Sequence, residues 1–389
     1  MSASLVRVGR DGSGAPALVD DEGPVRFALG NAYYLAEEAA RGRDGLVEET
    51  FDKLTRLGVR VIRTWAFNDD PAKHDSAIRR DGRELHEPGL RGLDRVLARA
   101  RAHGVRLILP LVNYWNAYGG TRQWCLWAGM KDAIEGDPRF YTDERVRKMF
   151  AAHVAELLER RNPETGVRYG EDPIVLAWEL MNEPRGNGVT EDELVDWIRA
   201  TGGVIRGRAR QLISLGEEGH ERSFEGYDHR YWRSVGGESL FSEAQGGSYS
   251  RHVSLPEIDL ASVHFYPEKY GITPGHELQA GVRWIESHVA VAHAAGKPAY
   301  VGELGLANEH SAFARFSLAD RRAIYRAWFV AAWRAGVAGI GPWCYAHDSR
   351  PDEWDDFTWY CKDGLPLHAE ENRYADLVAE LAAMMTASS

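Results

Sequence analysis

A pattern that recurs four times along the chain constrains its fold more than any other feature. A helical stretch ends at a glycine, and a short run of apolar and β-branched residues follows at once. The four copies read "LTRLGVRVIRT", "ARAHGVRLILP", "AHAAGKPAYVG" and "AWRAGVAGIGP". A glycine at this point can adopt the left-handed backbone conformation that ends a helix. Helices that alternate with buried strands predict an α/β protein with a parallel sheet.

Further apolar runs complete a set of eight predicted strands. They cover residues 27–32, 59–64, 105–111, 174–180, 211–215, 260–264, 299–302 and 337–342. Eight parallel strands close into a barrel, so we expect a (β/α)8 TIM barrel with long βα loops. The length of 389 residues suits one such domain, and no linker or repeat divides it. We expect residues 1–389 to form a single catalytic domain, with residues 1–25 as an N-terminal extension that caps the bottom of the barrel.

The charge and the hydropathy of the chain limit its partners. The formal net charge is −11, from 47 basic and 58 acidic residues, which argues against a nucleic acid or an anionic membrane as partner. No apolar run is long enough to span a membrane. The first residues lack a signal-peptide stretch, so we expect a cytoplasmic protein, or a secreted one if a signal peptide has been removed.

The cysteines and histidines give no sign of a cofactor. The three cysteines, at positions 125, 344 and 361, fit free thiols in a reducing compartment. One bridge between the loops after the third and eighth strands is the alternative. The histidines are scattered without a zinc-binding spacing, and no glycine-rich phosphate loop follows a strand. We therefore expect neither a metal nor a cofactor.

Two glutamates at predicted strand ends carry the candidate chemistry. Glu183 ends the fourth strand in "WELMNEPR", where burial favours the protonated form that a proton donor needs. Glu303 follows the seventh strand in "KPAYVGELGL". Retaining glycosidases use two carboxyl groups about 5–5.5 Å apart, and two strand-end glutamates across a barrel mouth can reach that separation. An ordinary turn at Glu183 and a solvated loop carboxylate at Glu303 are the alternatives.

Side chains at other strand ends would support such a pair. Arg63 ends the second strand and could keep Glu303 ionised, or form a structural salt bridge instead. Tyr266, after the sixth strand, could donate a hydrogen bond to the nucleophile. His264 could face Glu183 or a sugar hydroxyl, although a structural role is the alternative. Trp343, after the eighth strand, would be either the floor beneath a sugar or a core aromatic.

Taken together, these residues resemble glycoside hydrolase family 5. Arg63, Asn182-Glu183-Pro184, His264-x-Tyr266, Glu303 and Trp343 occur in the order of that family, and the resemblance runs from "FALGNAYYL" to "GPWCY". It implies a TIM barrel with Glu183 as general acid/base and Glu303 as nucleophile. It also implies that Asn182 binds the 2-hydroxyl of the sugar at the cleavage point.

Within the family, the chain resembles the mannan-active branch more than the cellulases. The segments "GNAYYL", "RTWAFND" and "LVNYWNAYGG" carry this likeness, and Asn113 stands near a position where many cellulases have histidine. The sequence contains 13 tryptophans and 16 tyrosines, and aromatic rings in a cleft bind the flat faces of sugars. The aromatic candidates for the cleft are Trp65, Trp115, Tyr118 and Trp124, each of which could instead pack beneath a loop.

The sequence therefore predicts a retaining glycoside hydrolase that cleaves β-mannosidic bonds. We favour an exo-acting β-mannosidase on short β-1,4-mannosides or mannosyl-β-1,4-N-acetylglucosamine. No secretion signal is visible, and the long loops over 113–142 and 216–257 could close one end of the cleft. An endo-β-1,4-mannanase is the alternative, ahead of a β-glucanase or a non-catalytic carbohydrate-binding barrel. The preferred linkage and the oligomeric state stay open.

Overall fold

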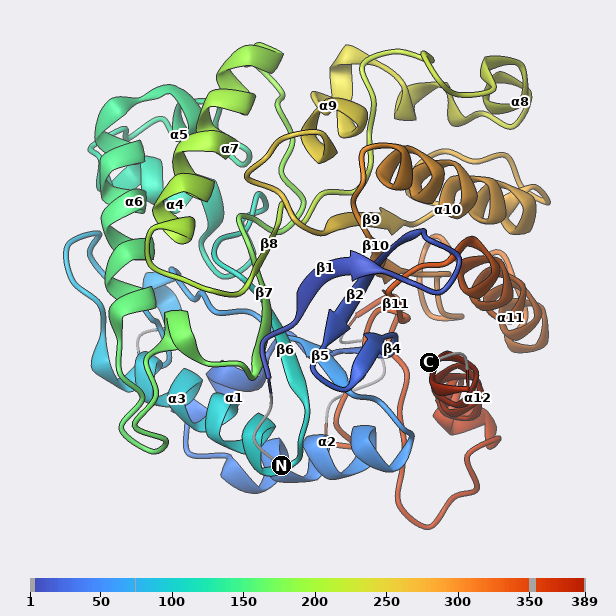
Figure 1. Ribbon diagram of the computed structural model, residues 1–389, viewed down its shortest axis with the longest axis horizontal. Coiled ribbons are helices and arrows are strands. Elements are labelled where there is room, and N and C mark those ends of the chain that lie inside the picture. The colour runs from blue at the N-terminus through green and yellow to red at the C-terminus, as the bar shows by residue number, and fades with distance from the viewer. Residues whose placement is uncertain (1–3, 74, 350–354, 388–389) are drawn as a thin grey trace.

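The computed structural model describes residues 4–73, 75–349 and 355–387. Eight parallel strands form a barrel with helices around it (Figure 1). The strands are β4 (Phe27–Asn31), β5 (Val61–Arg63), β6 (Arg106–Pro110), β7 (Val175–Glu179), β8 (Leu212–Ser214), β9 (Ala261–Phe265), β10 (Ala299–Leu304) and β11 (Gly339–Ile340). β4 pairs with β11, and a parallel bridge between Ser214 and Leu260 joins β8 to β9. Each predicted strand overlaps an observed one, so the predicted TIM barrel is confirmed.

The helices lie between successive barrel strands, except for α12, which follows β11, and they cover the outside of the barrel. They are α1 (Leu35–Ala40), α2 (Asp44–Arg56), α3 (Glu87–Ala102), α4 (Gly120–Trp127), α5 (Arg139–Thr142), α6 (Glu144–Glu159), α7 (Glu191–Arg206), α8 (His229–Ser234), α9 (Tyr249–Val253), α10 (Glu277–Ala294), α11 (Leu318–Ala335) and α12 (Ala375–Thr386). The four glycines of the repeated pattern have φ angles of 65° to 84°, which is the left-handed backbone conformation expected of a residue that ends a helix. They are Gly58, Gly104, Gly296 and Gly336. None of the described helices combines the length and apolarity needed to cross a membrane.

A small antiparallel sheet precedes the barrel. It consists of β1 (Arg7–Arg10), β2 (Pro16–Asp20) and β3 (Gly23–Val25), and it lies in front of the barrel strands in Figure 1. Val6 and Leu18 are buried in one cluster with residues from most of the barrel strands. The Arg106 guanidinium at the start of β6 donates to the Asp20 carboxylate at 2.6 Å. The small sheet therefore packs at the end where the barrel strands begin.

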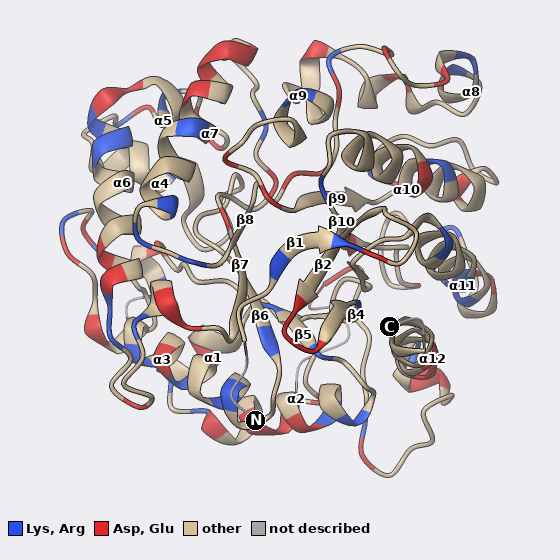
Figure 2. Cartoon of the chain, viewed as in Figure 1, with Lys and Arg blue, Asp and Glu red and all other residues tan. Residues whose placement is uncertain are grey.

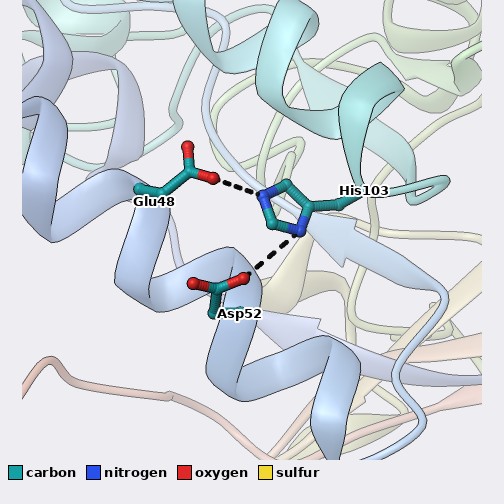
Figure 3. Close-up of side chains that lie close together, drawn as sticks. All are labelled: Glu48, Asp52 and His103. Atoms are coloured by element: carbon teal, nitrogen blue, oxygen red, sulfur yellow. Dashed lines mark hydrogen bonds and ion pairs between the residues drawn. The ribbon is translucent and has the colours of Figure 1, made fainter.

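Charged side chains join neighbouring helices on the outside of the barrel. Figure 2 shows acidic and basic residues interspersed along these helices. One contact joins α2 to α3, where the His103 ring lies between two carboxylates (Figure 3). Its Nε2 lies 2.9 Å from Glu48, and its Nδ1 lies 3.7 Å from Asp52. Arg99 also approaches Glu48, at 3.0 Å, so the cluster is an ion-pair contact between the two helices.

The long loop between β8 and β9 forms a lobe on the outside of α10. It contains α8 and α9, and its aromatic residues pack on that helix. The rings of Trp232 and Phe241 lie 5.7 Å and 6.1 Å from Trp284, while Tyr249 lies 4.8 Å from His288. The bulk of this loop is therefore held against the helical shell.

The three cysteines do not pair. Cys125, Cys344 and Cys361 are all buried, and none of them forms a disulfide. The alternative of a bridge between the loops after the third and eighth strands is therefore wrong.

Candidate active site

A cavity of about 540 Å³ opens where the barrel strands end. Its described lining residues come from the loops after seven of the eight strands, with Glu303 supplied by β10 itself: Tyr33, Trp65, Asn113, Trp115, Ala117, Asn182, Glu183, Arg185, Glu218, Tyr266, Lys269, Tyr270, Glu303, Trp343, Asp355 and Phe357. The C-terminal end of the strands is where α/β barrels build their active sites. Eight of the ten predicted site residues line this cavity. The other two, Arg63 and His264, are fully buried and contact its carboxylates.

Glu183 is held in an unusual backbone conformation four residues after the end of β7. Its φ angle is +52°, in a region that side-chain-bearing residues rarely adopt, and its N–H donates to the Gly216 carbonyl at 2.8 Å. The carboxylate has two partners. The Trp115 indole N–H donates to Oε2 at 2.6 Å, and His264 Nδ1 lies 2.8 Å from Oε1. Only 9 % of the residue is exposed.

Glu303 lies inside β10, whereas the sequence placed it just beyond the strand. The pairing of β10 with β9 shifts register between Val301 and Glu303, which marks a bulge. A bulge changes the direction of a side chain, and here the carboxylate faces the cavity. Arg63 Nη1 donates to Oε1 at 2.6 Å, and the Tyr266 hydroxyl donates to Oε2 at 2.6 Å. The two partners predicted for this carboxylate are both present.

Glu303 and the ionisable groups beside it are all buried, so they shift the pKa values of one another. Burial raises the pKa of Glu303, and nearby Glu183 adds to this, while His264, Arg63 and Tyr266 oppose it. Burial also lowers the pKa of the His264 ring, but the facing carboxylates of Glu303 and Glu183 outweigh it, so the net shift is upward. His264 therefore favours the protonated, cationic form, next to both carboxylates.

The two carboxylates are close to each other. Oxygen atoms of Glu183 and Glu303, together with a ring nitrogen of His264, lie within 4.8 Å of one another. Beneath them, Asn182 accepts from Arg63 Nη2 at 2.6 Å and donates to Asn113 Oδ1 at 3.0 Å. This chain of contacts fixes Asn182 and Asn113 beside the carboxylate pair.

Aromatic rings form one wall of the cavity. Trp343 stacks on Tyr33 with ring centres 5.2 Å apart, and Tyr33 stacks on Trp65 at 4.5 Å. Two other aromatic candidates lie elsewhere. Trp124 is fully buried and donates its indole N–H to Asp69 at 2.8 Å, so its assignment to the cleft is wrong. Tyr118 packs edge-on against Trp65 and donates to Glu37, behind the described lining residues.

The opposite wall contains residues that the sequence did not single out. Arg185 lies over the Trp115 ring, 4.9 Å from its centre, and makes two bonds to the Glu218 carboxylate at 2.7 and 2.8 Å. The Tyr270 hydroxyl donates to the same carboxylate at 2.9 Å. Arg185 directly follows the Asn-Glu-Pro motif, which was the available signal. Glu218 lies four residues after the end of β8, so its position beyond a strand end was the available signal.

Comparison with known proteins identifies the family. A family model described as GH family 5 beta-mannosidase-like matches residues 27–374. The chain belongs to glycoside hydrolase family 5. The predicted resemblance to the mannan-active branch of this family is confirmed, and the chain is a glycoside hydrolase.

Individual relatives of this family 5 chain are also named as mannan-cleaving enzymes. A putative mannan endo-1,4-beta-mannosidase 5 of Oryza sativa subsp. japonica is 34% identical, over 85% of this chain and 69% of its own length. Mannan endo-1,4-beta-mannosidase 5 of Arabidopsis thaliana is 30% identical, over 95% of this chain and 84% of its own length. Among solved structures, the endo-1,4-beta-D-mannanase of Thermotoga petrophila RKU-1 matches with a TM-score of 0.81 at 26% identity. That match covers 92% of this chain and 99% of the other.

Proposed function

We propose that this family 5 chain is a retaining endo-β-1,4-mannanase, with Glu183 as general acid/base and Glu303 as nucleophile. The observation that carries the proposal is the pair of buried carboxylates at the ends of β7 and β10, with oxygens within 4.8 Å of each other. A retaining mechanism uses carboxyl groups about 5–5.5 Å apart, whereas an inverting one needs about 6.5–9.5 Å to fit a water molecule.

In the first step, a Glu303 oxygen forms a bond to the anomeric carbon while the glycosidic C–O bond breaks. Glu183 gives its proton to the departing oxygen. Arg63 and Tyr266 hold the nucleophile by hydrogen bonds to its two oxygens, so its direction of attack is set before substrate arrives. The product of this step is a mannosyl ester on Glu303.

In the second step, the ionised Glu183 takes a proton from a water molecule. The oxygen of that water forms a bond to the anomeric carbon, and the bond to Glu303 breaks. Trp115 and His264 support this change of role, because each contacts a different oxygen of Glu183. Two displacements at one carbon return it to its original configuration.

The position of the acid/base also suggests how the sugar chain runs. Glu183 must face the oxygen that joins the cleaved sugar to the rest of the leaving chain. We therefore place the leaving sugars along Trp115, Arg185 and Glu218. The sugars that stay with the nucleophile would follow the aromatic wall from Trp343 to Tyr33 and Trp65.

Two lines of support favour internal cleavage over the removal of single sugars. The relatives and the structure described above carry endo-acting names. The exo expectation rested on the lack of a visible secretion signal and on the loops over 113–142 and 216–257, which could close one end of the cleft. The 216–257 loop packs against α10, and Glu218 is its single contribution to the described cavity lining. The endo-β-1,4-mannanase, which the sequence offered as the alternative, is thus better supported than the exo-acting β-mannosidase that the sequence favoured.

Early products of mannohexaose test the proposal. We expect a spread of mannobiose and mannotriose, with mannobiose itself cut slowly and cello-oligosaccharides left intact. Mannose as the sole product from the first samples would contradict endo action. Cleavage of the glucose series alone would contradict the mannoside assignment. The Glu303→Ala variant is the control, because it should lose turnover while it still binds mannohexaose. A carbohydrate-binding barrel would show no turnover in either protein.

A further inference from the structure

A third carboxylate lies beneath the catalytic pair. Glu179 is the last residue of β7, is fully buried, and is not among the described residues that line the cavity. Its Oε2 accepts from Arg63 Nε at 2.9 Å, and its Oε1 accepts from the Tyr300 hydroxyl. The steps above do not use Glu179, because it cannot touch the substrate. It does touch the cation that holds the nucleophile.

Arg63 divides its donors among three acceptors. Nε bonds to Glu179, Nη2 bonds to Asn182 at 2.6 Å and also lies 2.9 Å from Glu179, and Nη1 bonds to Glu303. A guanidinium is rigid and planar, so fixing Nε and Nη2 fixes the direction in which Nη1 points. Because Arg63 and Glu179 are both fully buried, water does not compete for these contacts, which help to fix the position of the cation.

The single positive charge of Arg63 faces two carboxylates. Its other charged or titratable neighbours are His264 and Glu183, with the Tyr266 hydroxyl on Glu303 and the Tyr300 hydroxyl on Glu179. In a buried site, charges at hydrogen-bond distance interact strongly. A cation paired with Glu303 alone would stabilise that carboxylate more than a shared one does. A more stabilised carboxylate is a weaker nucleophile, since the attack must give up that stabilisation.

We propose that Glu179 is a positioning residue for the nucleophile: it fixes the Arg63 guanidinium against Glu303 and takes up part of the charge of that cation. The inference rests on the proposed role of Glu303. It assigns two separable effects to one buried glutamate. The length of its side chain fixes the position of Arg63, and its negative charge takes up part of the charge of that cation.

Two substitutions separate the effects. Glu179→Gln keeps the length of the side chain and removes its charge, so Arg63 acts on Glu303 alone. We expect the acid limb of the kcat/KM profile on mannohexaose to move to lower pH by about one unit, and kcat to fall about tenfold. Glu179→Asp keeps the charge and shortens the reach. There we expect kcat to fall while the acid limb stays in place. KM should change little in both variants, because Glu179 does not face the cavity.

Thermal unfolding of each variant identifies a merely structural role. Loss of kcat in Glu179→Gln with an unmoved acid limb and a lower Tm would overturn the proposal. If Glu179→Gln does not fold, a natural kcat in Glu179→Asp would overturn it equally. Glu303→Ala separates the two levels of inference. Turnover in that variant would refute the role of Glu303, whereas a dead Glu303→Ala beside an unchanged Glu179→Gln profile would refute only the role of Glu179.

Discussion

The Trp115 indole connects two parts of the active site through different atoms. Its N–H donates to Glu183, while its ring face lies against the Arg185 guanidinium. The first contact orients the acid/base, and the second stabilises the wall proposed for the leaving sugars. Because the two contacts use different features of the ring, a substitution can remove one and keep the other.

Trp115→Phe keeps an aromatic face and removes the N–H donor. A hydrogen bond to a charged group contributes about 1.5–3 kcal/mol, so we expect kcat to fall at least tenfold. KM for mannohexaose should change less. Trp359→Phe is the matched control, because the Trp359 indole nitrogen has no hydrogen-bond partner among the described residues and Trp359 is not among the described residues that line the cavity. Its kcat should stay near that of the natural protein, and an equal loss in both variants would contradict the role of the Trp115 N–H.

Much of the site could be predicted at this scale, because parallel strands bring their ends to one edge of the barrel. Arg63, Glu183 and Glu303 could be grouped from strand order alone. Trp124 could not be placed, since nothing in a loop sequence reports that its indole would be buried on Asp69. Glu218 was missed although it follows β8 by only four residues, because the sequence does not show which of the glutamates at positions 217, 218 and 221 faces the cavity.

At the scale of elements, a buried histidine joins three segments of the barrel rim. His252 on α9 lies 2.8 Å from Glu217, which follows β8, and 3.0 Å from Glu191 at the start of α7. Burial disfavours the charged ring, but the two carboxylates outweigh it and raise the pKa of His252 to about 10. The lobe between β8 and β9 is thus held partly by a buried ionic contact.

The stability of the protein should therefore depend on pH through His252. The folded pKa lies above the unfolded value of about 6.5, so the stabilisation is complete below that pH and is lost as the pH rises through about 10. His252→Gln removes one partner of a buried ion pair, which costs about 3–5 kcal/mol. We expect its Tm to lie several degrees below that of the natural protein at pH 6, with the gap closing towards pH 10.

A histidine whose pKa is lowered rather than raised provides the control. His293 is half-buried on α10, and burial lowers its pKa. His293→Gln should show no Tm gap that closes with rising pH. A constant gap in His252→Gln across the same range would contradict the ionic role of that ring.

The strands could be predicted closely, while the connecting lobes could not. Each strand has an apolar run of its own and a helix-ending glycine or turn beside it. The lobe helices α8 and α9 are only six and five residues long, and distant aromatic contacts with α10 hold them in place. The local sequence of α8 and α9 does not show that they contact a distant helix. This also bears on the expectation of exo action, which assumed in part that the 216–257 loop closes one end of the cleft.

At the scale of the whole molecule, the N-terminal sheet and the catalytic carboxylates lie at opposite ends of the barrel. The N-terminal sheet buries Leu18 among residues such as Phe27, Ile108 and Tyr300, while the carboxylates lie where the strands end. In barrels of this type the two ends can vary separately. Cellular location stays a prediction from the sequence.

Leu18→Ala tests this separation. The side chain is 1% exposed, and truncating a buried leucine costs about 2–5 kcal/mol through lost burial and the cavity left behind. We expect a Tm lower by several degrees and an unchanged kcat on mannohexaose at 25 °C. The matched substitution Val8→Ala on the exposed side of β1 should change neither quantity. A fall in kcat for Leu18→Ala at a temperature where the protein is fully folded would contradict the separation.

The pairing of β4 with β11 joins the first and the last barrel strand along the chain, and this matters during synthesis. β4 leaves the ribosome before the other barrel strands, and all five of its residues are buried in the folded protein. The edge of β4 that pairs with β11 has no partner until β11 is synthesised. An open, apolar strand edge is a site for aggregation, and contacts between distant residues form slowly. The synthesis of β11 therefore determines when the open edge of β4 is protected from aggregation. Premature termination before β11 leaves a sheet that cannot close.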